Sequence, residues 1–205
     1  MTPRVRMTGK ERREQLLDVA RSLFAERGFD AASVEEIAHR ANVSKPVVYE
    51  HFGGKEGIYA VVVDREMSAL LSRMTAALAG DAHPRALLER AARALLDYVD
   101  SSADGFRIMV RDSPVATSTG TFASLLSDIA SQVEHILAVQ FDTRGYDPKL
   151  AALYSQALVG MVALTGQWWL EVRKPKKDDV AAHLVNLAWN GLSHLEKKPT
   201  LRERG

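Results

Sequence analysis

The side chains of this sequence that are best suited to chemistry lie between residues 45 and 55, and they suit contact with a polyanion. Lys45 carries an ammonium group that can reach the O6 and N7 acceptors of guanine. Pro46 and Val47 offer apolar contacts of the kind that suits the methyl group of thymine. Tyr49 and His51 can donate hydrogen bonds to phosphate oxygens, and Lys55 can neutralise a phosphate. These residue types predict recognition of double-stranded DNA.

Two short helices separated by a tight turn are predicted to position these side chains. Ser33 and Glu36 form an S-x-x-E capping box that starts the first helix. Asn42 tolerates the left-handed backbone region, so it can end that helix in a sharp turn. Ser44 then caps the second helix, which carries Pro46 in its first turn. This spacing is typical of a helix-turn-helix, whose second helix enters the major groove of DNA.

The second short helix is predicted to have one buried face and one outward face. Val48 and Phe52 are four residues apart, so both can pack on the preceding helices. The helix N-terminus offers free backbone N–H groups and the positive end of a dipole, and both favour phosphate. The residues left to point outward near that end are Lys45, Pro46, Val47 and Tyr49.

The rest of the chain is also predicted to be helical, because Ala, Leu, Glu and Arg are abundant and alternating β-branched runs are scarce. A helix over 10–27 ends at Gly28, which suits a left-handed helix end. Further helices are predicted over 55–79, 84–100, 104–112, 119–141, 147–173 and 178–195. The predicted fold class is all-α, with an N-terminal three-helix domain at 1–54 and a helical body at 55–205.

The bulk composition indicates a folded protein and says little about partners. The chain has 205 residues, of which 46% are apolar, so it can bury a core. Its formal net charge is only +1, so a nucleic-acid signal must be local. Residues 1–13 hold four arginines and one lysine, with Glu11 as the single acid. This basic arm either follows phosphates or is a solvated start of the chain, and both readings stay open.

Two kinds of site are disfavoured by the sequence. The chain contains no cysteine, which excludes disulfides and thiolate metal sites, and we expect no cofactor or metal. The uncharged stretch from Leu150 to Leu170 is long enough to cross a bilayer. It also carries Gln156, Gln167 and hydroxyl groups, which are costly in hydrocarbon. We therefore expect a helix buried in a core or dimer interface, no membrane contact, and a cytoplasmic protein.

The body is less informative than the N-terminal domain. Six residues are candidates to line a pocket for a small-molecule effector, although aromatic and Met side chains at helical spacing also form ordinary cores. These candidates are Phe106, Met109, Phe122, Met161, Gln167 and Trp168. The neighbours Glu134 and His135 are not a catalytic pair, because adjacent helical residues do not face each other.

The residues of the predicted helix-turn-helix carry a resemblance to a known family. The run from Glu36 to Tyr59 (EIAHRANVSKPVVYEHFGGKEGIY) resembles the signature of the TetR family of bacterial transcriptional regulators, and so does the approach Leu23–Phe29 (LFAERGF). Asn42 stands where the family usually has Gly, which the turn accommodates. Glu50 puts a carboxylate near DNA, where we expect it to lie along the rim or to pair with a lysine or arginine.

The resemblance implies an all-helical homodimer with N-terminal DNA-binding domains, a ligand pocket in the body and a four-helix dimer interface from the last two long helices. In this sequence Lys45, Pro46 and Val47 would face bases. The residues implied to lie near phosphates are Ser33, Ser44, Tyr49, His51 and Lys55. The function implied is a ligand-responsive repressor that binds an inverted-repeat operator as a dimer.

Two other classes of protein fit the sequence less well. An enzyme is disfavoured, because the sequence contains no H-E-x-x-H, phosphate loop or G-x-S-x-G. A helical adaptor that has lost specific DNA binding is the remaining alternative. It is disfavoured because Lys45, Tyr49 and Lys55 are all present.

Overall fold

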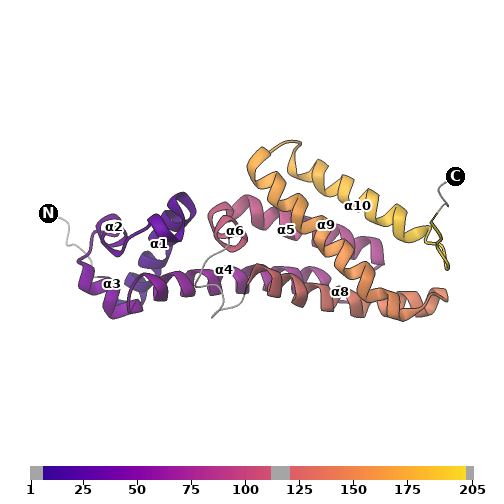
Figure 1. Ribbon diagram of the computed structural model, residues 1–205, viewed down its shortest axis with the longest axis horizontal. Coiled ribbons are helices and arrows are strands. Elements are labelled where there is room, and N and C mark those ends of the chain that lie inside the picture. The colour runs from indigo at the N-terminus through magenta and orange to yellow at the C-terminus, as the bar shows by residue number, and fades with distance from the viewer. Residues whose placement is uncertain (1–6, 112–120, 202–205) are drawn as a thin grey trace. The chain divides into compact units, whose positions relative to one another are not determined.

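A computed structural model describes residues 7–111 and 121–201 of the chain, and every regular element within those ranges is helical (Figure 1). The elements are α1 (Gly9–Ala31), α2 (Val34–Arg40), α3 (Lys45–Phe52), α4 (Lys55–Leu78), α5 (Pro84–Ser101), α6 (Ala103–Val110), α8 (Phe122–Arg144), η1 (Pro148–Leu150), α9 (Ala151–Val172) and α10 (Lys177–Ser193). The prediction of an all-α fold is confirmed. Arg4 and Arg6 of the basic arm lie outside the described residues.

Helix α1 begins and ends differently from the prediction. Its N-terminus has a complete capping box that the sequence analysis missed: the amide of Glu11 donates to Thr8 Oγ1 (3.2 Å), and the amide of Thr8 donates to Glu11 Oε2 (2.7 Å). Gly28 does adopt a positive φ of 79°, but the helix resumes beyond it and continues to Ala31. The kink lets Phe29 lie against Phe24, with 6.2 Å between ring centroids.

The helix-turn-helix forms as its turn residues predict. Ser33 caps α2, with its hydroxyl accepting a hydrogen bond from the amide of Glu36 (3.2 Å). Only this half of the predicted capping box forms, because the Glu36 carboxylate pairs with Arg27 and Arg40 instead. Asn42 has φ 52°, so the left-handed residue in the turn is confirmed. Gly53 closes α3 in the left-handed conformation, where its N–H donates to the carbonyl of Tyr49. In the first turn of α4, a β-carbon at Gly57 would be 1.9 Å from the carbonyl oxygen of Phe52, so α4 can start this close to α3 only with glycine there.

One apolar core holds these helices together. Ile37 of α2, Val48 of α3 and Ile58 of α4 are each 0% exposed and belong to one cluster with Leu23 of α1. Burying large aliphatic side chains in this way contributes about 1.5–3 kcal/mol for each of them. Val48 therefore lies on the buried face of α3, as predicted.

A helix from later in the chain also belongs to that core. Ile108 of α6 is 1% exposed and is a member of the same cluster. Just after α6, Nη1 of Arg111 donates to the carbonyl oxygen of Ala25 in α1 at 2.8 Å. The chain accordingly divides into a first unit, made of residues up to Ala69 with Ser102–Phe122, and a second unit, made of Leu70–Ser101 with residues from Ala123 on.

The boundary between these two compact units falls inside α4, between Ala69 and Leu70, whereas the sequence predicted a domain boundary between residues 54 and 55. The functional boundary between those two residues stays a prediction. The physical reason for this position of the division is that the first half of α4 and Ile108 of α6 bury side chains in the core of the helix-turn-helix.

In the second unit, α5 packs against both α9 and α10. Its buried residues include Leu95, Leu96, Tyr98 and Val99. Gly166 of α9 lies where a β-carbon would be 3.1 Å from Leu95, so the small residue permits close packing with α5.

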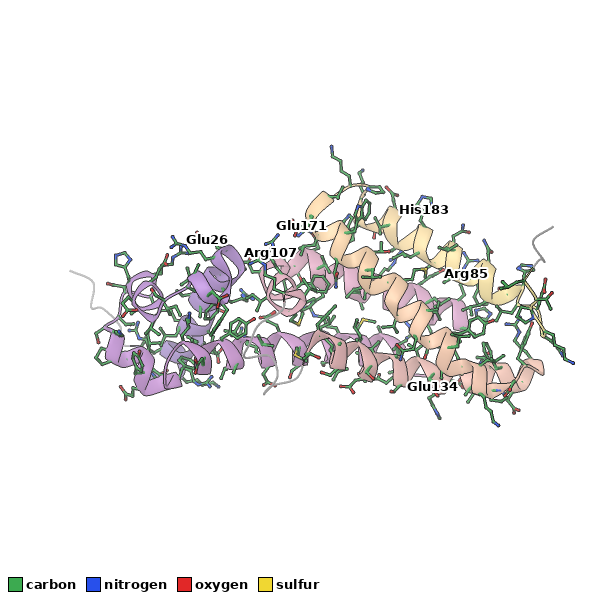
Figure 2. All side chains as sticks on the ribbon, viewed as in Figure 1. Glu26, Arg85, Arg107, Glu134, Glu171 and His183 are labelled. Carbon is green, nitrogen blue, oxygen red and sulfur yellow. The ribbon has the colours of Figure 1, made fainter. Side chains whose placement is uncertain are left out.

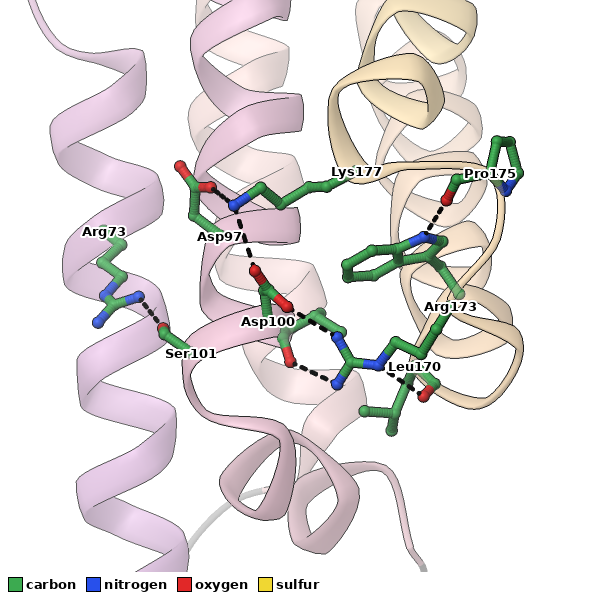
Figure 3. A network of polar contacts seen from close by, with 10 residues as sticks. Arg73, Asp97, Asp100, Ser101, Leu170, Arg173, Pro175 and Lys177 are labelled. Atoms are coloured by element: carbon green, nitrogen blue, oxygen red, sulfur yellow. Dashed lines mark hydrogen bonds and ion pairs between the residues drawn. The ribbon is translucent and has the colours of Figure 1, made fainter.

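The turn between α9 and α10 is tied to the C-terminal end of α5 by charged groups (Figure 3). Lys177 Nζ lies 2.7 Å from Asp97 Oδ1 and 3.3 Å from Asp100 Oδ2, and Arg173 Nη1 lies 3.1 Å from Asp100 Oδ1. The indole N–H of Trp169 donates to the carbonyl of Pro175 at 2.9 Å. Two cations of this charged segment, Arg173 and Lys177, are therefore paired with carboxylates of α5.

Candidate nucleic-acid interface

The outward face of α3 presents the side chains that were predicted to read DNA. Lys45, Pro46 and Glu50 are exposed, and Tyr49 is 46% exposed. Val47 is only half-buried, because it also packs against the core of the first unit. The face is therefore polar and aromatic at its surface, with Val47 as its deepest member.

Lys45 has a specific partner in this arrangement. Its ammonium group forms an ion pair with the Glu35 carboxylate of α2, and it lies 5.7 Å from the centroid of the Tyr49 ring. The hydrogen bond from Lys45 lowers the pKa of the Glu35 carboxyl, and the hydrogen bond to Glu35 raises the pKa of Lys45. Both groups are thus charged at neutral pH, and Lys45 is held between α2 and the next turn of α3.

The residues predicted to lie near phosphates have different surroundings. Ser44 is the exposed N-cap residue of α3, and its side chain makes no capping hydrogen bond to the described residues around it. The Ser33 hydroxyl oxygen already accepts from Glu36, but it keeps its own hydrogen to donate. His51 is half-buried, with its ring centroid 6.1 Å from that of Phe52.

Lys55 has a structural role that the sequence analysis missed. Its Nζ donates to the carbonyl oxygens of Phe29 (3.0 Å) and Asp30 (3.3 Å), and it lies 4.4 Å from the centroid of the Phe29 ring. These carbonyls belong to the last turn of α1, where a cation also complements the helix dipole. Contact of Lys55 with a phosphate stays a prediction.

Side-chain contacts with α1 brace the helix-turn-helix. Arg40 of α2 pairs with Glu26 of α1 at 2.8 Å, which holds α2 on α1 (Figure 2 labels Glu26), and it also pairs with Glu36 within α2 at 3.0 Å. The hydrogen bond from Arg40 lowers the pKa of the Glu26 carboxyl. The side-chain amide of Gln15 donates to the carbonyl of Ala41 at 3.3 Å, which holds the turn itself. The contacts of Arg40 with Glu26 and of Gln15 with Ala41 join residues 14 and 26 positions apart, so periodicity could not reveal them.

The six pocket candidates fall in both units. In the first unit Phe106 and Met109 are buried, and the Phe106 ring lies 5.7 Å from that of Phe122. In the second unit Met161 and Gln167 are half-buried, and Trp168 is 49% exposed. The pocket stays a prediction, and Trp168 lies on the surface of its unit.

An exposed apolar surface marks α9 and α10. Leu153 is 64% exposed, Leu164 66% and Leu187 64%. The segment Pro148–Val172 is long and apolar enough to pass a test for a membrane span, and only 22% of its most apolar window is buried by the rest of the described chain. Leu153, Leu164 and Trp168 recur at spacings of eleven and four residues, which places them on one face of α9.

Glu134 and its neighbour His135 are both exposed, and Figure 2 shows the Glu134 side chain pointing away from α8. Among residues 7–111 and 121–201 no three His, Asp or Glu side chains are grouped closely enough to hold a metal ion.

The geometry defines a helix-turn-helix DNA-binding protein with a helical body, and comparison with known sequences supports the same class. Residues 16–62 match the profile of bacterial regulatory proteins of the tetR family, and residues 73–203 match the tetracyclin repressor-like C-terminal domain. The chain belongs to the TetR family of transcriptional regulators, as the sequence predicted.

Named relatives cover nearly the whole chain. It is 33% identical over 195 residues to the HTH-type transcriptional activator FasR of Mycolicibacterium smegmatis. The matched residues make up 93% of this chain and 87% of FasR. It is 33% identical over 186 residues to the HTH-type transcriptional repressor Rv3405c of Mycobacterium tuberculosis, and the match covers 85% of this chain and 90% of Rv3405c. The solved structure of a TetR-like regulator from Rhodococcus sp. RHA1 is similar, with a TM-score of 0.78 and 26% identity. The superposition covers 92% of this chain and 99% of that regulator.

Proposed function

We propose that this regulator binds an inverted-repeat operator as a homodimer and represses transcription until a small-molecule effector releases it. The observation that supports this most directly is the division of α3 into two faces. Val48 is 0% exposed, whereas Lys45, Pro46 and Tyr49 are exposed beside the helix N-terminus. This is the arrangement that a recognition helix needs in a major groove.

DNA binding is tested first with duplexes from immediately upstream of the gene for this protein and its neighbours. Fluorescence anisotropy at two salt concentrations should show saturable binding about a thousandfold tighter than to random DNA. Weak binding equal to that of random DNA, for these duplexes and for any selected from a random pool, would instead favour the adaptor that has lost specific DNA binding.

Repression, rather than activation, is proposed because repression is typical of the family to which the chain belongs, and a dimer bound over a promoter would block polymerase. The named relatives include both an activator and a repressor. A promoter–reporter fusion separates the two: repression predicts higher reporter expression when the gene for this protein is deleted, and activation predicts lower expression.

The dimer is proposed to form through α9 and α10. The exposed leucines there, Leu164 and Leu187, need a cover, and a second copy supplies an identical apolar surface. Replacing Leu164 and Leu187 by Glu should give monomers in analytical ultracentrifugation. Leu201→Glu is the matched control, because Leu201 is 96% exposed outside these helices. If the double variant remains dimeric, the interface lies elsewhere.

The effector is proposed to bind in the body and to act on the DNA-binding domain through α4. The candidate residues are the six named above, and stearoyl-CoA is the first probe because a regulator with the same fold, FadR from Bacillus subtilis, was solved in complex with it. An effector should lower DNA affinity, and by linkage DNA should lower effector affinity by the same factor.

We further propose that the protein acts in the cytoplasm, without a cofactor and without catalytic activity.

A further inference from the structure

The ion pair between Glu35 and Lys45 lies on the surface that is proposed to read DNA. The two side chains are 63% and 47% exposed, and exposed pairs of this kind contribute little to stability. The neighbouring Glu36 does the structural work of α2, since its side chain is only 22% exposed and pairs with Arg27 and Arg40 at 3.0 Å each.

Glu35 changes what Lys45 can offer to DNA. A lysine that is free in solution neutralises a phosphate of any DNA sequence and releases a counter-ion. Lys45 already has an anionic partner, so its charge adds little to that sequence-independent attraction. The carboxylate of Glu35 is in addition repelled by the phosphates.

The base-reading capacity of Lys45 survives this pairing. An ammonium group has three donors, so one bond to Glu35 leaves two for the neutral acceptors O6 and N7 of guanine. The Tyr49 ring, 5.7 Å from Nζ, further restricts where the ammonium group can go. The pair therefore favours a directed contact with a base over a mobile contact with the backbone.

We propose that Glu35 is a specificity-determining residue: it neutralises Lys45 toward phosphates, suppresses binding to non-operator DNA, and orients Lys45 toward guanine. This inference rests on the proposed function, because it requires that α3 reads an operator. A residue that weakens the wrong complexes is a recognised route to specificity, since discrimination depends on the difference between two affinities.

The test compares Glu35→Gln with wild type in the full-length protein. The probes are a duplex selected by the wild-type protein from a random pool and a random-sequence duplex, each measured by fluorescence anisotropy over a salt series. Glu35→Gln should bind random DNA about fivefold tighter at 0.15 M salt, with a salt slope steeper by about one, the effect of one further counter-ion. The selected duplex should gain less, so the specificity ratio falls.

Glu89→Gln is the matched control, because Glu89 is an exposed carboxylate of α5 that pairs with Arg85 at 3.2 Å. It should change neither affinity. A second background, Lys45→Met, shows whether Glu35 acts through Lys45: there Glu35→Gln should no longer alter discrimination between guanine and other bases. Thermal melts show whether each variant is folded. If Glu35→Gln weakens the start of α2, Glu35→Ala replaces it in the same binding measurements.

Two results would overturn the inference. Glu35→Gln could behave like Glu89→Gln on both duplexes, which would leave the pair without a role in binding. It could also tighten both duplexes equally, so that the specificity ratio is unchanged and Glu35 merely repels DNA. Failure of the proposed function looks different, because the wild-type protein itself would then fail to prefer any selected duplex over random DNA.

Discussion

The Cα of Gly105 in α6 lies so close to Glu66 in α4 that a β-carbon at residue 105 would be 2.0 Å from the carboxylate oxygen Oε2. Glu66 is only 4% exposed, and its Oε1 lies 3.4 Å from Nη1 of Arg21 in α1. Three helices of the first unit therefore meet at one buried carboxylate, and the missing side chain of Gly105 makes room for it.

Gly105→Ala is expected to displace the Glu66 carboxylate and to lower the free energy of unfolding. Over-packing of a buried site costs about 1–3 kcal/mol, and a disturbed buried charge adds to it. Denaturant unfolding measures the change. Gly9→Ala is the control, since a β-carbon there meets nothing within 4 Å, and it should leave stability unchanged or raise it slightly. Equal stability of the Gly105→Ala variant and wild type would show that Glu66 moves aside without cost.

The capping box of α1 should make stability depend on pH. The backbone hydrogen bond from Thr8 lowers the pKa of the Glu11 carboxyl. Because the pKa of Glu11 is lower in the folded state than in the unfolded state, its ionised carboxylate stabilises the fold at any pH above the unfolded-state pKa. This stabilisation is lost as the pH falls through the folded-state pKa. Glu11→Gln should therefore have a lower denaturation midpoint than wild type at pH 7, and the two midpoints should converge in acid. A pH-independent gap would assign the effect to packing.

The turn of the helix-turn-helix depends on the left-handed backbone of Asn42, whose φ is 52°. Asn42→Ala should lower the free energy of unfolding by about 1 kcal/mol, because the left-handed region is costly for a residue with a plain β-carbon. Asn42→Gly should be at least as stable as wild type. Circular-dichroism melts compare the three proteins. The turn argument is wrong if Ala and Gly are tolerated equally.

Lys55→Ala should weaken the fold as well as DNA binding. It removes a charged donor from the carbonyls of Phe29 and Asp30, and a hydrogen bond to a charged group contributes about 1.5–3 kcal/mol. If Lys55 also contacts a phosphate, its loss reduces the slope of log affinity against log salt by about one unit. A stability loss with an unchanged slope would confine Lys55 to the fold.

Local chemistry explains which parts of the fold the sequence predicted. Ser33, Asn42 and Gly53 each act through their own backbone or that of a neighbour, so the two short helices and their turn were predictable. The assignment of Val48 to the buried face followed in the same way from helical spacing. The family signature from Glu36 to Tyr59 covers the same region, and the resemblance predicted the function.

Long-range contacts explain what was missed. The sequence does not reveal that Ile108 joins the core of the helix-turn-helix, because that contact depends on a pairing of α6 with α1. It likewise gave no sign that Glu35 would hold Lys45 or that Lys55 would bind carbonyls of α1. Each of these contacts requires the relative placement of helices that periodicity alone does not supply.

The most direct test of the account is hydroxyl-radical footprinting of the wild-type protein on its selected duplex. Two copies that each insert α3 into a major groove should protect two symmetry-related segments on one face of the DNA, about one helical turn apart or a multiple of it. Tyr49→Ala, which removes an exposed side chain of α3, should weaken both protected segments together. A single protected segment, or protection that does not depend on the DNA sequence, would contradict specific recognition by a dimer.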